Sequence, residues 1–153
     1  MFPKMRKMKS AMNEEDTRNL LRRCPEGTLG TIGTNGYPHS VPVNYVLYNE
    51  KIYIHSAKEG YKLSNIKENP KVTFTVFDSA NILEEKFTTN FQSAIVYGKA
   101  KIIPGDAVIL MELIRKYSSN FVKAGTKYVD MNYDATYLIE ITIEHMTGKA
   151  SNK

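Results

Sequence analysis

The sequence contains few of the side chains that build covalent cross-links or metal centres. It has one cysteine, Cys24, and three histidines, His39, His55 and His145. A single cysteine excludes an intrachain disulfide and favours a reducing compartment. The histidines stand far apart, without cysteine or carboxylate neighbours at ligand spacing, so we expect no metal site. Cys24 precedes Pro25 and is expected to end a helix rather than to act as a nucleophile.

Long apolar runs are also missing. The basic start, MFPKMRKMKS, is followed by polar residues instead of the apolar core of a signal peptide. No stretch approaches the roughly 18 apolar residues of a membrane-spanning helix. We therefore expect a cytoplasmic protein without a membrane partner.

The net charge of +5 is concentrated at the two ends of the chain. Residues 1–9 carry four basic and no acidic side chains, and residues 149–153 carry two basic and none acidic. The remainder holds 15 basic and 16 acidic side chains, whereas duplex DNA requires a basic stripe on the folded body. No nucleic-acid partner is expected. At 153 residues the chain fits one domain, which we place at 13–148, between a basic arm (1–12) and a basic tail (149–153).

The common catalytic motifs are absent as well. The chain has no GxSxG, no GxGxxG and no GxxxxGK[ST], which argues against a serine hydrolase of that type, a Rossmann fold and a P-loop. Its adjacent carboxylates are typical of solvated charge, and no acid–base pair stands out. Such a sequence is expected of a protein whose cofactor carries the chemistry.

Turn residues and periodicity predict a mainly antiparallel β fold in the first half. Asn13 and the acids after it predict a helix at 14–23. Asn35-Gly36 predicts a hairpin between strands 27–33 and 38–47. A turn at 48–50 leads to a strand at 51–55. A helix is expected at 61–68, because Asn69-Pro70 stops it.

The second half continues the pattern. We expect strands at 71–77, 91–103 and 135–143, a loop at 79–90, a helix at 105–117 and an irregular or weakly helical segment at 118–134. Gly98 is expected to mark a bulge or bend. About six antiparallel strands with short flanking helices favour a barrel over a doubly wound parallel sheet.

The segment IYIHSAKEGYKLSNIKENP at 52–70 is the most informative. A strand ends at His55-Ser56, and a loop with Lys58 and Gly60 leads into a helix near Tyr61-Lys62. A helix start with free amides, a close-approaching glycine and two lysines suits a terminal phosphate. The same composition also fits a polar connection with solvent-facing lysines. Taken alone, composition favours this simpler interpretation over a phosphate site.

His55 ends a strand and is open to two interpretations. It is either a half-buried histidine bonded to a backbone carbonyl, or a ring beside a ligand that exchanges a proton near neutral pH. His39 is expected to be exposed, and the role of His145 is left open.

Four stretches of the chain carry a likeness to a known family: GYPHSVPVNYV, IYIHSAKEGYKLSNIKENPKVTFTV, EKFTTNFQSAIVYGKAKI and IEITIEHMTGKA. They resemble the pyridoxamine 5'-phosphate oxidase-like FMN-binding split β-barrels, most of all the branch that contains the nitroimidazole-resistance (Nim) proteins. The resemblance extends from Met5 to Ala150. It implies a six-stranded antiparallel split barrel and a homodimer that holds FMN in its interface grooves.

The resemblance also implies the residues of the flavin site. The phosphate would lie on the loop and helix start, in contact with Ser56, Ala57, Lys58, Gly60, Tyr61 and Lys62. The isoalloxazine ring would lie along Val43, Asn44 and Tyr45, with His55 beside it as the candidate catalytic proton donor. Segments 88–93, including Ser93, and 145–149 would approach from the partner chain.

The implied activity is that of an FMN-dependent oxidoreductase that reduces or oxidises a small aromatic or nitro-aromatic molecule. Oxidation of a B6 phosphate is not expected, because the chain has no arginine after Arg115 to build the C-terminal motif of those oxidases. Val41-Pro42-Val43 also stands where they carry a phosphate-binding arginine, so lysines would take over that charge. Two alternatives stay open: a non-catalytic flavin-binding sensor, and a haem-handling split barrel with one of the three histidines as axial ligand.

Overall fold

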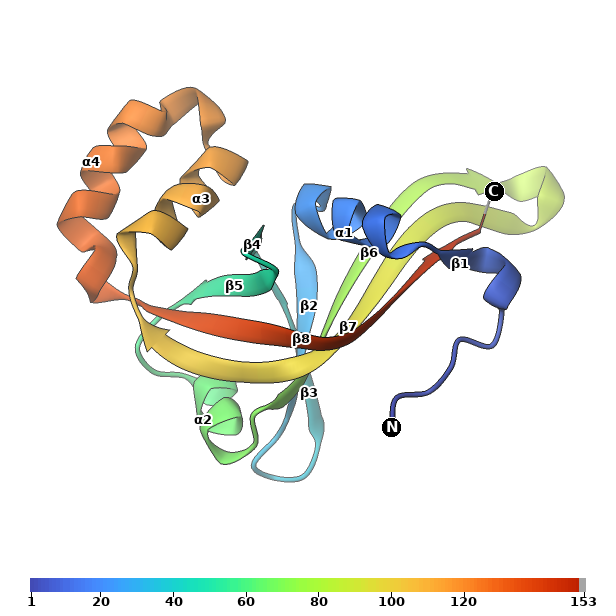
Figure 1. The fold of residues 1–153 in the computed structure, drawn as a ribbon, viewed down its shortest axis with the longest axis horizontal. Coiled ribbons are helices and arrows are strands. Elements are labelled where there is room, and N and C mark those ends of the chain that lie inside the picture. The colour runs from blue at the N-terminus through green and yellow to red at the C-terminus, as the bar shows by residue number, and fades with distance from the viewer. Residues whose placement is uncertain (152–153) are drawn as a thin grey trace.

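The computed structural model describes residues 1–151, and the last two residues of the expected basic tail lie outside this part. Figure 1 shows its strands and helices in chain order: β1 (Ala11–Met12), α1 (Glu14–Arg23), β2 (Gly27–Ile32), β3 (Pro38–Val43), β4 (Val46–Tyr48), β5 (Lys51–Ser56), α2 (Tyr61–Glu68), β6 (Lys71–Leu83), β7 (Thr88–Pro104), α3 (Ala107–Tyr117), α4 (Val122–Asn132) and β8 (Tyr137–Ala150). Short 3-10 turns lie at Met8–Ser10, Glu84–Lys86, Ser119–Phe121 and Tyr133–Ala135. None of the helices described is long and apolar enough to cross a membrane.

The strands form one antiparallel sheet in the order β3-β2-β6-β7-β8-β5-β4, and β1 pairs with β8. This confirms the expected mainly β, antiparallel split-barrel architecture with flanking helices. The number of strands is eight and not six, because the predicted strand 38–47 is divided into β3 and β4 and the short β1 was not foreseen. The sheet path does not close, since it ends at β3 and β4.

Local capping explains why α1 begins where the sequence predicts. The Asn13 side chain accepts a hydrogen bond from the Asp16 amide at 2.7 Å, and three acids occupy the first turn, where the helix dipole favours negative charge. Leu20 and Leu21 are buried on its inner face. The helix therefore covers one side of the sheet and closes the main core.

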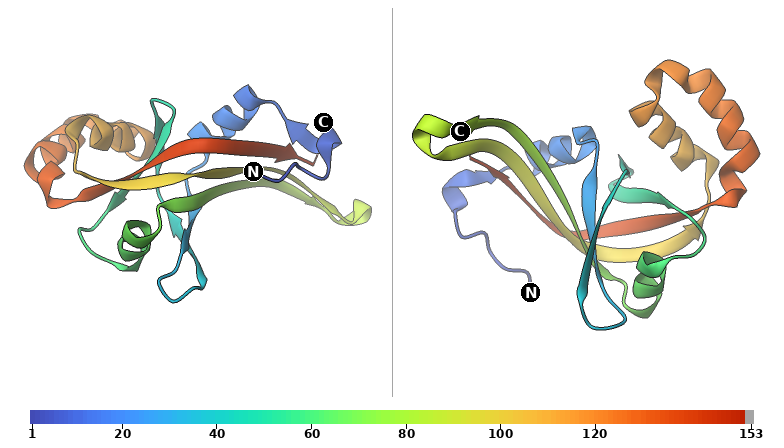
Figure 2. Two further views of the ribbon diagram at one scale, coloured as in Figure 1. Left: turned by 60° about the horizontal axis from the view of Figure 1, so that its bottom comes forward. Right: turned by 180° about the vertical axis from the view of Figure 1, so that it is seen from behind.

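The prediction of a loop at 79–90 is wrong, because a long β6–β7 hairpin occupies this segment. β6 continues to Leu83 and β7 begins at Thr88, with a register shift between Ser79 and Asn81. The side chains of this hairpin are largely exposed on both faces, so the sequence lacks the alternation of a half-buried strand. Figures 1 and 2 show the hairpin projecting from one end of the sheet.

Helices α3 and α4 pack side by side at the other end of the sheet (Figures 1 and 2). Helix α4 is regular over the segment predicted to be irregular or weakly helical. Gly125 permits the close approach, because a Cβ there would lie 2.4 Å from a methyl carbon of Ile114. The predicted Gly98 bulge is confirmed by a register shift between Tyr97 and Gly98 against β8.

Strands β5 and β8 are buried on both faces at Ile52–Ile54 and Leu138–Ile139, and this part of the sheet positions the site. Ile52 and Ile54 lie in the main core, whereas Tyr53 and Leu138 pack with Ile109 of α3 in a second cluster. The side chain of His55 follows Tyr53 on the face that α3 covers, because successive side chains of a strand alternate. Strand β8 continues to Ala150 and pairs with Ala11 and Met12, so the sheet includes the first two residues of the expected tail.

Candidate flavin site

The loop between β5 and α2 has the features of a phosphate-binding turn. Gly60 has a φ of 146°, a conformation that L side chains rarely adopt, and no atom lies within 4 Å of the position that a Cβ would take. Helix α2 begins at Tyr61 without a side-chain cap and without an acid in its first turn. The amides of this turn, beside Lys62, therefore suit an anion.

The predicted phosphate ligands differ in how they are placed. Lys62 is half-buried and Lys58 is exposed, with its Nζ 5.5 Å from the centroid of the Tyr137 ring. The Ser56 hydroxyl is buried and donates to the Ala57 carbonyl at 3.0 Å, so it would have to rotate to reach a ligand. The structure thus supplies two lysines and free helix amides at this loop.

Helix α2 packs on the sheet through the buried Leu63 and Ile66 and is hydrogen-bonded to it by the buried Asn65. Asn65 is fully buried, its Oδ1 accepts from the Thr34 amide at 3.1 Å, and its Nδ2 donates to the Thr31 hydroxyl at 3.0 Å. Buried polar groups with satisfied bonds fix geometry. The start of α2 is therefore held rigidly beside β2.

A cavity of about 420 Å³ lies between the sheet and helices α3 and α4, and His55, near the end of β5 that leads into this loop, is one of its lining residues. The sheet side contributes three of the predicted ring contacts, Val43, Asn44 and His55, together with Thr136. The helices and their ends contribute Leu110, Leu113, Ile114, Tyr117, Ser118, Tyr128, Val129, Asn132 and Tyr133. Largely apolar walls with a few polar groups are typical of a small-molecule site.

The helical wall of this cavity was missed by sequence reasoning. The segment 118–134 showed no clear apolar face, yet Tyr128 and Asn132 stand four residues apart and so share a helix face around the buried Val129. The Asn132 amide donates to the Tyr128 carbonyl at 2.9 Å. The i,i+4 spacing of an aromatic and an amide is the signal in the sequence that could have indicated this wall.

Tyr45, also predicted as a ring contact, has a different position. Its ring is fully buried and packs against Phe74 with centroids 4.6 Å apart. Its hydroxyl donates to the Leu21 carbonyl, and burial strongly raises its pKa. The Tyr45 side chain therefore belongs to the core and not to the cavity lining.

The end of α3 is fastened to the chain between β3 and β4. The Tyr117 hydroxyl accepts from the Tyr45 amide at 2.9 Å, and Lys116 Nζ donates to the Tyr45 carbonyl at 2.9 Å. Lys116 Nζ also lies 3.7 Å from the centroid of the Tyr45 ring. These bonds hold α3 over Asn44 and so maintain the cavity.

Replacing Lys116 with methionine is expected to remove a pH dependence of stability. Burial lowers the pKa of Lys116 to about 8 from an ordinary value of 10.5. Between these two pKa values the unfolded chain binds more protons than the folded one, so the free energy of unfolding rises with pH. The rise from pH 8 to pH 10 should be about 1–2 kcal/mol, after allowance for the partial exposure of the side chain.

Urea unfolding at pH 8 and pH 10 measures this effect. The wild-type chain and a Lys127→Met control, whose lysine is exposed on α4, should show the rise. In the Lys116→Met chain, the rise in the free energy of unfolding between pH 8 and pH 10 should be smaller by about 1–2 kcal/mol. Equal pH dependence in all three chains would mean that Lys116 is not held in a desolvated position.

Ser93 lies far along the sheet from the turn before α2. Ser56 pairs with Tyr137, which pairs with Pro104 at one end of β7. Ser93 is eleven residues from Pro104 along the same strand, or about 36 Å at 3.3 Å per residue. One chain does not bring Ser93 to the loop, so any contribution from it has to come from a second copy.

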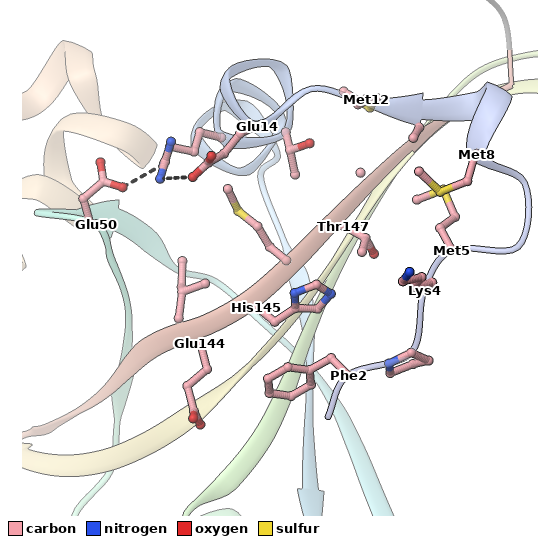
Figure 3. A pocket seen from close by; sticks show the side chains of 17 residues that line it. Phe2, Lys4, Met5, Met8, Met12, Glu14, Glu50, Glu144, His145 and Thr147 are labelled. Carbon is pink, nitrogen blue, oxygen red and sulfur yellow. Dashed lines mark hydrogen bonds and ion pairs between the residues drawn. The ribbon is translucent and has the colours of Figure 1, made fainter.

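A second, larger hollow of about 980 Å³ lies under the N-terminal arm (Figure 3). Phe2 of the arm stacks on His145 of β8, with ring centroids 5.0 Å apart and planes inclined by 2°. The Nε2 atom of His145 is buried without a hydrogen-bond partner among the described residues. In residues 1–151 no three His, Cys, Asp or Glu side chains gather in a way that suits a metal ion.

The fold is an antiparallel split barrel in which an uncapped helix start with two lysines follows β5, and a small, largely apolar cavity lies between the sheet and helices α3 and α4. The profile of the family described as pyridoxamine 5'-phosphate oxidase matches residues 13–150. The chain therefore belongs to this family. A comparison with curated proteins finds no match.

Solved structures agree on the fold. A proposed 5-nitroimidazole antibiotic resistance protein from Bacteroides thetaiotaomicron aligns with a TM-score of 0.72 at 20% identity, over 92% of this chain and 86% of that one. A conserved hypothetical protein from Mycobacterium tuberculosis aligns with a TM-score of 0.83 at 17% identity, over 97% and 91%. The flavocytochrome Anf3 from Azotobacter vinelandii aligns with a TM-score of 0.72 at 21% identity, over 98% and 73%.

Proposed function

We propose that this chain binds FMN between two copies of itself and uses it to reduce or oxidise a small aromatic molecule. The observation that carries the proposal is that two features follow one another at the end of β5. His55 of β5 lines a cavity together with Val43 and Asn44, and the chain then passes directly into the turn before α2, which suits a terminal phosphate. Membership in the family and the likeness to a flavocytochrome support a flavin.

Each part of the site has a distinct role in this proposal. The phosphate is held by hydrogen bonds from the first amides of α2 and by charge-assisted hydrogen bonds from Lys58 and Lys62. Val43 and Asn44 flank the ring, and the apolar helices exclude water. A bound flavin supplies the exchange of electrons with the substrate. His55, at the cavity wall, donates or accepts the proton that accompanies this exchange.

The exposed apolar side chains of the β6–β7 hairpin support the second copy. Phe87 is 97% exposed, Ile82 73% and Phe77 60%. A cluster of this kind on one projecting element is typical of a surface that another protein covers. A second copy seated against the hairpin would also bring its Ser93 toward the first copy's flavin phosphate.

The experiment titrates the flavin-free protein with FMN, FAD and riboflavin and monitors binding by the quenching of flavin fluorescence. Sedimentation equilibrium then measures the mass of the flavin-loaded protein. We expect saturation at one FMN per chain, weaker binding of riboflavin, and a mass of two 17.4 kDa chains. A monomer that binds no flavin contradicts the proposal. Preference for FAD, or binding by a monomer, contradicts the corresponding part of it.

A further inference from the structure

We infer that the cavity under α3 and α4 selects uncharged aromatic molecules and holds one hydrogen-bond acceptor of the molecule on the hydroxyl of Thr136. The inference rests on the proposed function, because it takes this cavity as the substrate side of the flavin site. It adds the chemical class of the substrate and a residue that fixes its orientation.

The first observation is the absence of charge from the cavity wall. Of the thirteen residues that line it, all within the described part of the chain, none is lysine, arginine, aspartate or glutamate. Charged residues make up 24% of the sequence, so about three would be expected by chance. Apart from His55 when it is protonated, the wall offers no counter-ion. A carboxylate or phosphate moved into such a cavity therefore loses its hydration with little compensation, and this is unfavourable.

The lysines of the site do not offset this absence. Lys58 and Lys62 belong to the turn before α2 and do not line the cavity. Lys116 is engaged with the carbonyl and ring of Tyr45. An anionic group on the substrate would therefore compete with the flavin phosphate for the turn or remain in water.

The second observation is the state of Thr136. Its Oγ1 atom is buried and has no hydrogen-bond partner within residues 1–151, and the residue lines this cavity. Its position is fixed by the backbone, since its carbonyl accepts from the Gly105 amide at 3.1 Å and its neighbour Tyr137 pairs with Ser56 of β5. An unpaired buried hydroxyl is costly, so a ligand atom that accepts from it is favoured.

Most other polar groups of the wall are bonded or exposed to water; Asn44 and His55 are exposed, and Ser118 is half-buried. Tyr117 is engaged with Tyr45, and the Asn132 amide donates to the Tyr128 carbonyl. The side chains of Tyr128 and Tyr133 are 63% and 43% exposed. Thr136 thus carries the buried, unpartnered donor of this wall. A rotation about its Cα–Cβ bond would turn the hydroxyl toward a ligand oxygen in the cavity, for instance that of a nitro or carbonyl group.

The experiment measures binding of two matched probes, 4-nitrobenzamide and 4-nitrobenzoate, by isothermal titration calorimetry on the FMN-loaded protein. The two differ in the charge of one group. We expect the benzoate to bind about 30-fold or more weakly than the amide. A Ser118→Lys chain, which places a cation at the cavity wall, should narrow this gap, whereas the neutral Ser118→Gln control should not. Equal affinity of the two probes for the wild-type protein overturns the charge selection.

Variants of Thr136 test the hydroxyl. Thr136→Val keeps the shape and removes the donor, and should weaken nitrobenzene binding about 5-fold. Binding of toluene, which has no acceptor, should be unchanged, and Thr136→Ser should retain the affinity for nitrobenzene. An equal effect on both probes, or no effect, overturns the role of Thr136.

Two further readouts separate this inference from the proposed function. The flavin content of each sample is measured by absorbance, and the titrations are repeated on flavin-free protein. Protein that refuses flavin but keeps the probe preference overturns the proposed function and supports the cavity assignment. Protein that holds flavin without the probe preference overturns the inference alone.

Discussion

Replacing His55 with alanine is expected to leave FMN bound and to slow turnover of a nitro-aromatic acceptor about 100-fold. His55 lines the cavity but does not belong to the phosphate turn, so its loss removes a proton donor without removing a phosphate ligand. Positioned general acids of this kind contribute roughly 10²–10⁴-fold. The measurement compares flavin affinity, by fluorescence quenching, with turnover under steady-state conditions.

The control for His55 is His39→Ala. His39 lies on β3 and does not line the cavity. Its ring packs against that of Tyr61 in a T-shaped arrangement, with ring centroids 5.0 Å apart. Its replacement should leave turnover near the wild-type value. Turnover should fall in His55→Ala alone. Unchanged turnover in that variant would remove His55 from the chemistry, and loss of flavin would show that it acts in binding instead.

Replacing Lys62 with alanine is expected to weaken FMN binding about 30-fold while riboflavin binding changes little. Hydrogen bonds to charged groups contribute about 1.5–3 kcal/mol each, and 2 kcal/mol corresponds to roughly 30-fold in affinity. Riboflavin has no phosphate and so does not report on Lys62. The affinity of the variant for FMN should therefore fall toward its affinity for riboflavin.

The matched control for Lys62 is Lys67→Ala on the same helix. Lys67 lies in the last turn of α2 and is exposed, at the end opposite to the proposed phosphate. Its removal changes the net charge equally but should leave both affinities unchanged. An equal loss of FMN affinity in the two variants would indicate general electrostatic attraction and not a phosphate site at the start of α2.

The elements with clear local signals were predicted well from the sequence. Helix α1 begins after its Asn13 cap, and α2 ends before Asn69-Pro70, as the capping and stop residues indicate. The hairpin at Asn35-Gly36 and the bulge at Gly98 also follow from residues whose backbone preferences are strong. These features depend on neighbours in the sequence and need no knowledge of the tertiary structure.

The features that were missed depend on contacts between distant segments. The break between β3 and β4 arises because the Tyr45 ring turns into the core and its amide pairs with Tyr117, seventy-two residues away. Helix α4 is stabilised by its packing on α3, and its own apolar pattern is weak. The cavity depends on both, which explains why its sheet side was foreseen and its helical side was not.

The extended hairpin escaped prediction for a different reason. Its strands are paired with each other by backbone hydrogen bonds far beyond the core, so neither face carries a regular apolar row. Hydrophobic patterns in a single sequence report which residues are buried. Few residues of this hairpin are buried, so its strands leave no such pattern. Its exposed phenylalanines become intelligible if a second chain covers them.

The absorption spectrum of the freshly purified protein tests the central claim most directly, together with the identity of the ligand released by heating. The account predicts the two-banded yellow spectrum of a flavin and a released compound that matches FMN. A colourless protein that also refuses added FMN would contradict the phosphate site at Gly60–Lys62. A single intense haem band would contradict the flavin assignment and direct attention to the histidines.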